Sequence, residues 1–198
     1  MTEVAASAAG AAETTMDRFV IDSRASRFTV RAFATGILSA MGHNPTVGIR
    51  IFSGEMKFDP EQLKAGAFQL VIESSSLGVQ DDISDKDRRE MERLMSDEVL
   101  ETSKFPEIRY EASDITIARM GDALFSAKLD GSLTFHGVTR KESIAARVTQ
   151  MGSMLRASGE FSLSQANYGI KPVSVAGGAL KLKDELKFSF EIVARKQE

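Results

Sequence analysis

The chain of 198 residues contains no cysteine and no tryptophan, and it has only two histidines and four prolines. The absence of cysteine excludes disulfides, thiolate metal sites and a cysteine nucleophile, and it leaves the redox compartment undecided. No run of 18 or more apolar residues occurs, so no membrane-spanning helix is predicted. With a formal net charge of −3 the chain has no general excess of basic residues, and nucleic acid is not an expected partner.

Several motifs of enzyme chemistry are also missing. The phosphate loops G-x-x-x-x-G-K-S/T and G-x-G-x-x-G do not occur, nor does the nucleophile elbow G-x-S-x-G. The two histidines, His43 and His136, do not form an H-E-x-x-H motif. Counting alone leaves a Ser-His-Asp triad open, but no serine sits in an activating motif. None of these motifs therefore points to an enzyme.

What the chain does contain is alternation of apolar and polar residues. In the segment 123–136, Phe125, Leu129, Leu133 and Phe135 share one parity, while mostly charged or hydroxyl-bearing residues share the other. A period of two predicts a strand with one dry face and one wet face. At 14 residues the segment exceeds the usual strand length. Several such strands predict a tall antiparallel sheet closed into a barrel with apolar side chains facing the lumen.

Shorter alternating segments recur along the chain. We expect an all-β fold, a barrel of about eight strands, with eight or nine strands in all, mostly joined by hairpins. The parity switches between Ile51 and Phe52, and again between Ala112 and Ile115, which predicts β-bulges or bends at both places. The predicted strands lie within 27–33, 47–58, 68–72, 108–117, 123–136, 138–149, 155–163, 179–183 and 186–194.

One domain is expected, because no linker divides the chain after its first residues. Residues 1–17 are a low-complexity stretch rich in alanine, serine and threonine, which predicts a disordered N-terminal tail before a domain at 18–198. The tail lacks the positive and strongly apolar regions of a secretory signal, so a cytoplasmic location is expected.

The segment 84–100 predicts the one convincing helix, lying on the surface of the barrel. Ser84 is a candidate N-cap with Asp87 three residues on. An apolar stripe at helical spacing would pack on one side only. The region 81–101 holds nine acidic and four basic residues, which is typical of a solvated helix face and leaves open a docking surface for a basic partner. The stripe consists of Met91, Leu94, Met95 and Val99.

Small residues alternate with large ones on the predicted inner faces, which indicates a ligand cavity. These small residues are Ala123, Ala127, Gly131, Ala157 and Gly159. The alternative is that the protein's own side chains fill the lumen, as they do in many barrels of this size. The residues expected to contact a ligand are Phe28, Val30, Leu70, Ile72, Phe125, Leu129, Leu133, Phe135, Phe161, Leu163, Phe188 and Phe190.

The two histidines leave alternatives open. His43, in an irregular loop at 42–45, would either fix the loop or contact a ligand or metal. Together with Asp81, Asp82 and Asp85 it suits a hard or borderline divalent ion, which keeps a metal-dependent enzyme or metal carrier as the alternative function. The same aspartates equally suit the N-terminus of a helix. His136 is expected to bond a neighbouring backbone at the rim, with ligand contact as its alternative.

Several segments resemble the YceI-like polyisoprenoid-binding proteins in order and spacing across residues 19–195. They are 133–140 (LTFHGVTR), 105–110 (FPEIRY), 161–170 with Tyr168-Gly169-Ile170, 52–58 (FSGEMKF), and Ile21-Asp22 with Ser26 and Phe28. The chain departs from many relatives at Ala25-Ser26, where they have His-Ser, and at Gln165, where they have arginine.

The resemblance implies an extended lipocalin-like antiparallel barrel. It also implies a long-chain apolar small molecule, a polyprenyl lipid or an isoprenoid quinone, held in the lumen with its head at the rim near His43, Tyr168 or His136. No catalytic residue, metal or cofactor is carried over, apart from a bound lipid or quinone. A stress-related interaction module that docks a partner through the acidic helix is a third hypothesis, and a homodimer stays open.

Overall fold

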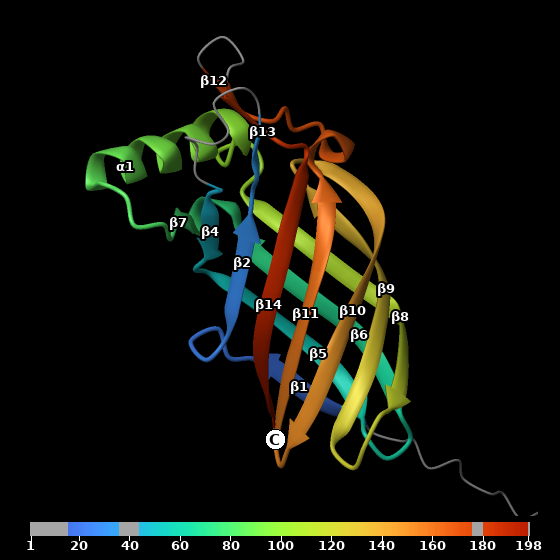
Figure 1. Ribbon diagram of the computed structural model, residues 1–198. Coiled ribbons are helices and arrows are strands. Elements are labelled where there is room, and N and C mark those ends of the chain that lie inside the picture. Colours follow the sequence, from blue (N-terminus) through green and yellow to red (C-terminus); the bar gives the residue numbers. More distant parts are fainter. Residues whose placement is uncertain (1–15, 36–43, 176–179, 198) are drawn as a thin grey trace, which may run out of the picture.

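The structure is a computed structural model that describes residues 16–35, 44–175 and 180–197. Within these residues, eight strands close into an antiparallel barrel, because the last strand pairs back to the first (Figure 1). The predicted all-β barrel is therefore confirmed. In order around the barrel the strands are β1 (Asp17–Ile21), β5 (Phe52–Asp59), β6 (Lys64–Glu73), β8 (Glu107–Arg119), β9 (Leu124–Phe135), β10 (Val138–Met151), β11 (Met154–Ser164) and β14 (Glu185–Lys196).

At its upper end the sheet divides. The first half of β14 pairs with β2 (Arg27–Arg31), while its last residues pair with β1. From β2 the sheet continues to β4 (Thr46–Ile49) and β7 (Leu77–Val79), and within the described residues β7 is an edge. The 3₁₀ turn η1 (Ser74–Ser76) carries β6 into β7, while β8 pairs with β6 and β9. In the described part of the chain, β7 and β8 are therefore not paired with each other, and the sheet is open between them.

A helix covers this divided end of the barrel (Figure 1). The α-helix α1 (Asp85–Leu94) runs into a π-helical turn, η2 (Met95–Val99), so the helix predicted at 84–100 is confirmed. Ser84 is its N-cap, and the Ser84 hydroxyl accepts a hydrogen bond from the backbone N–H of Asp87 at 3.1 Å. A small sheet of β12 (Ser174–Val175), β13 (Leu180–Leu182) and β3 (Ala34–Thr35) lies at the same end.

Polar side chains of the helix satisfy the exposed edge of β7. The Arg88 guanidinium donates to the carbonyls of Val79 at 2.6 Å and Asp81 at 2.9 Å. The Glu92 carboxylate accepts from the Val79 N–H at 3.0 Å. An unpaired strand edge is otherwise free to pair with another chain. These bonds hold the helix in place while its apolar stripe faces the barrel.

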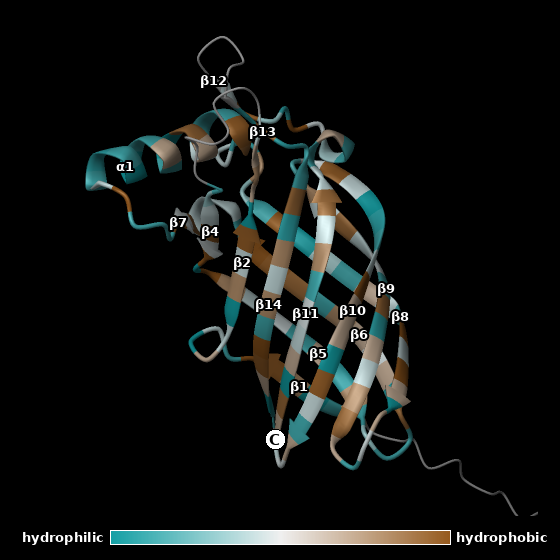
Figure 2. Ribbon diagram, in the orientation of Figure 1, coloured by the Kyte–Doolittle hydropathy of each residue, from teal (hydrophilic) through white to brown (hydrophobic). Residues whose placement is uncertain are grey.

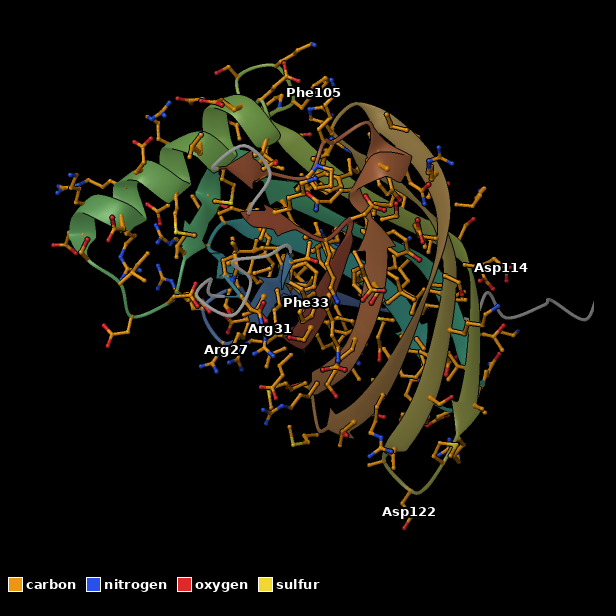
Figure 3. The ribbon with its side chains drawn as sticks, turned by 45° about the horizontal axis from the view of Figure 1, so that its top comes forward. Arg27, Arg31, Phe33, Phe105, Asp114 and Asp122 are labelled. Atoms are coloured by element: carbon orange, nitrogen blue, oxygen red, sulfur yellow. The ribbon has the colours of Figure 1, made fainter. Side chains whose placement is uncertain are left out.

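The strands show the expected inside-outside alternation (Figure 2). On β2, Phe28 and Val30 are buried, whereas Arg27 and Arg31 point away from the barrel (Figure 3). No helix in the described ranges is both long and apolar enough to cross a bilayer.

Both predicted parity switches correspond to irregularities. Ile51 lies between β4 and β5 with its side chain 55% exposed, while the adjacent Phe52 is buried. The β8–β9 register shifts between Ala112 and Asp114, and Asp114 lies on the outside of the barrel (Figure 3). A bulge inserts one residue and so moves the following side chains to the other face. A third register shift, in the β5–β6 pairing between Met56 and Phe58, was not predicted; there the extra residue lies on β6, between Ala65 and Phe68.

The expected tail boundary differs slightly from the structure. Strand β1 begins at Asp17, which the sequence assigned to the tail, and it pairs with β5 from its first residue. Residues 1–15 lie outside the described part of the chain.

Candidate ligand-binding lumen

Two adjacent apolar cavities lie inside the barrel. The lower chamber lies at the end of the barrel where β1 and the last residues of β14 pair, and its volume is about 100 Å³. The upper chamber lies beneath the helix, and its volume is about 220 Å³. Engineered apolar cavities of roughly 150 Å³ bind benzene. The upper chamber therefore has the size and lining of an apolar ligand site. Five residues border both chambers and form what we call the waist: Phe28, Leu70, Tyr110, Ile144 and Phe161.

The lower chamber ends in a tightly packed layer, which we call the floor. Phe19, Phe58 and Phe125 are each 1% exposed, and Leu155 is 2% exposed. The rings of Phe58 and Phe125 meet edge to face with their centroids 5.7 Å apart, a favoured aromatic geometry. Phe125 thus borders the lower chamber and also packs into the floor.

The upper chamber is covered by the helix. The predicted apolar stripe of Met91, Leu94, Met95 and Val99 borders this chamber. No residue of α1 or η2 is fully buried, and the four stripe residues keep part of their surface toward this chamber. The stripe therefore faces partly empty space. The sequence predicted its one-sided packing but not its role as the cover of a cavity.

The tyrosine of the waist is fixed by the backbone. The Tyr110 hydroxyl lies 2.8 Å from the carbonyl oxygen of Leu129 and 3.1 Å from that of Glu142. Gly131 makes this reach feasible, because a Cβ added there would lie 2.6 Å from Cζ of Tyr110. A side chain at position 131 would displace the ring.

This contact corrects one part of the cavity prediction. The space beside Gly131 is filled by Tyr110, and the space beside Gly159 by Phe190, whose Cζ a Cβ at Gly159 would approach to 2.7 Å. Ala123 lies in an exposed turn. Of the five small residues, Ala127 and Ala157 border the lower chamber as predicted.

All twelve apolar residues expected on the strands border at least one chamber. Their contact with a ligand stays a prediction, since only their position is established. The lower chamber takes Phe125, Leu129 and Phe190, the upper takes Val30, Ile72, Leu133, Phe135, Leu163 and Phe188, and both take Phe28, Leu70 and Phe161.

Tyr168 packs outside both chambers and is 0% exposed. Its hydroxyl donates to Oε1 of Glu142 at 2.7 Å, and its ring centroid lies 5.5 Å from that of Phe135. Tyr168 thus supports the chamber wall from behind. The sequence predicted instead that this residue contacts a headgroup. The main signal for Tyr168 was the family motif, which does not specify a side chain's direction.

His136 joins three elements at the upper rim. Its Nδ1 lies 3.2 Å from the carbonyl oxygen of Tyr168, and its Nε2 lies 3.0 Å from Oε2 of Glu101, the residue that follows the helical segment by two positions. The expected backbone bond is confirmed. His136 and Gly137 have φ values of 50° and 73°, as in the two-residue hairpin turns that favour glycine.

The second histidine, His43, lies outside the described residues. Asp81, one of its proposed metal partners, uses Oδ2 to accept from the Thr46 N–H at 2.9 Å. Within the described ranges, no three His, Cys, Asp or Glu side chains are grouped so as to hold a metal ion. The alternative metal function gains no support from this part of the chain.

Both tyrosines of the chain are buried, which gives a testable titration. Burial, with the negative charges of Asp130 and Glu142, raises the pKa of Tyr110 to about 12. Burial and the hydrogen bond to Glu142 raise the pKa of Tyr168 as well. The unfolded value is about 10. Because each folded pKa is the higher one, the stability that these groups contribute is complete below about pH 10 and is lost as the pH rises toward about 12.

We therefore expect tyrosinate absorbance of the folded protein to appear well above pH 10, whereas the urea-unfolded chain titrates near about 10. Urea unfolding at a series of alkaline pH values should show a falling free energy of unfolding. A Tyr110→Phe variant should lose part of that slope. Equal titration of folded and unfolded protein would contradict the buried positions of both rings.

Comparison with known proteins agrees with this architecture. The family model described as YceI-like domain matches residues 19–194. A polyisoprenoid binding domain from Saccharophagus degradans, implicated in plant cell wall breakdown, superposes with a TM-score of 0.67 at 14% identity, covering 92% of this chain and 99% of that one. Burkholderia cenocepacia BcnA gives 0.62 at 19% identity, covering 87% and 98%.

The Campylobacter jejuni YCEI protein gives a TM-score of 0.59 at 14% identity, covering 79% of this chain and 88% of that one. At these identities the likeness is one of fold. No curated protein is a significant match to the sequence.

Proposed function

The chain belongs to the YceI-like family, whose model spans residues 19–194, and from this we propose that it binds and carries an amphipathic isoprenoid-type lipid without catalysing a reaction. The ligand class is a polyprenyl chain or an isoprenoid quinone. The observation that carries the proposal is the apolar lumen, with two chambers that meet at an aromatic waist. One structural relative is itself described as a polyisoprenoid binding domain.

Burial of apolar surface would supply the binding free energy. Each Å² of apolar surface removed from water contributes roughly 25 cal/mol before the ordering of ligand and protein is subtracted. No charged side chain in the described ranges borders the upper chamber, so a hydrocarbon chain meets no desolvated charge there. A cytoplasmic location and a homodimer stay predictions of the sequence.

Native mass spectrometry of gently purified protein tests this proposal. We expect a retained adduct that organic extraction removes and that identifies as a prenyl lipid. Protein stripped of lipid should take up an added long-chain prenol with one-to-one stoichiometry. Protein that carries no lipid after repeated gentle preparations, and that takes up no added prenol, would overturn the proposal.

A further inference from the structure

One polar side chain faces the upper chamber with an acceptor left over. Gln165 opens the 3₁₀ turn η3 (Gln165–Tyr168), directly after β11, and it is 4% exposed. Among the described residues that border the upper chamber, only Gln165 and Tyr110 have polar side chains. The Tyr110 hydroxyl already lies against two backbone carbonyls. Gln165 is therefore the polar side chain of this lining that can still form a hydrogen bond with a ligand.

The orientation of the Gln165 amide follows from its partner. The side chain lies with Nε2 3.0 Å from the carbonyl oxygen of Lys183. A carbonyl only accepts hydrogen bonds, so the amide nitrogen must face it and Oε1 must point elsewhere. Oε1 has no hydrogen-bond partner among the described residues. No completely enclosed side-chain nitrogen or oxygen of the described residues lacks a partner, so Oε1 keeps surface that a donor from a ligand or water can reach.

The backbone holds this side chain in place. The Gln165 N–H donates to the carbonyl oxygen of Asp184 at 2.9 Å, and the Ile170 N–H donates to the Gln165 carbonyl at 3.1 Å. The next residue, Ala166, donates its N–H to Oδ1 of Asp184 at 2.7 Å. The amide is thus fixed at the upper end before any ligand enters, which is the condition for a specific contact.

Building on the proposed function, we propose that Gln165 selects the head of the ligand. Oε1 accepts a hydrogen bond from a neutral donor, the hydroxyl of a prenyl alcohol or of a reduced, quinol-type ring. An ionised phosphate at this place would meet an acceptor oxygen and, among the described residues that border the chamber, no cation. The apolar tail then extends past the waist toward the floor.

Three ligands of equal chain length test this assignment: a long-chain prenol, its methyl ether and its monophosphate. Affinity is measured by displacement of an apolar fluorescent probe from stripped wild-type protein. Because one neutral hydrogen bond changes a binding constant by roughly three- to tenfold, the prenol should bind more tightly than the ether by that factor. The monophosphate should bind the most weakly of the three.

A Gln165→Leu variant removes the amide with little change in size. It should bind prenol and ether equally, and Gln150→Leu, the same change in a strand residue that borders neither chamber, should keep the wild-type preference. Equal binding of prenol and ether by wild-type protein would overturn this inference and leave the proposed function intact. Failure of all three ligands to displace the probe would overturn the proposed function itself. The wild-type comparison decides the matter even if the variant fails to fold.

Discussion

A Leu129→Glu substitution should lower the affinity for a long-chain prenol by more than about a hundredfold, the factor that corresponds to about 2.7 kcal/mol. Leu129 lies in the middle of β9 and borders the lower chamber. It is paired with Ile115 on one side and Ile144 on the other. A carboxylate placed there would lose its hydration without gaining a partner, or it would draw water into the chamber. Either outcome removes the apolar surface on which binding depends.

A matched control lies three residues away on the same strand. Ser126 points outward and is exposed, so Ser126→Glu adds the same charge to β9 without entering the lumen. The affinity of the Ser126→Glu variant for prenol should stay within about twofold of the wild-type value. An uncharged variant, Ala157→Phe, tests the same space by filling the lower chamber and should also weaken binding. A folded Leu129→Glu protein that binds prenol normally would show that the ligand does not occupy this chamber.

Much of the barrel could be predicted because burial follows the strand period locally. On β9, side chains two residues apart share a face, so Phe125, Leu129 and Leu133 identify the inner surface from the sequence alone. The switch between Ala112 and Ile115 appears in the same pattern because a bulge reverses the parity. The N-cap at Ser84 was equally local.

What could not be predicted depends on register between distant strands. The alternation does not show that Tyr110 occupies the space beside Gly131, since that requires knowing that β8 and β9 align Tyr110 near this glycine. Nor does it show that β14 pairs with β2 along one half and with β1 at its end. Gln165 was noted only as a departure from relatives, because its spare acceptor depends on the Lys183 carbonyl.

The largest loss of stability is expected for Phe125→Ala. Phe125 is 1% exposed, its ring contacts Phe58 edge to face, and the Arg119 guanidinium lies 5.2 Å above it. Truncation of a fully packed phenylalanine leaves a cavity that the surrounding strands fill only in part, and it typically costs about 3–5 kcal/mol. Urea unfolding followed by circular dichroism should show that decrease in the free energy of unfolding.

Phe161→Ala provides the comparison that separates the floor from the binding site. Phe161 stacks on Phe188 with centroids 4.8 Å apart, but its ring also borders both chambers and so lacks protein contacts on that side. Its loss should lower the free energy of unfolding less than Phe125→Ala does, because the cavity it enlarges already exists. On the proposed function it should weaken prenol binding more, because a chain that extends through both chambers would contact the waist. The reverse order in both measurements would place the binding surface at the floor and the structural core at the waist.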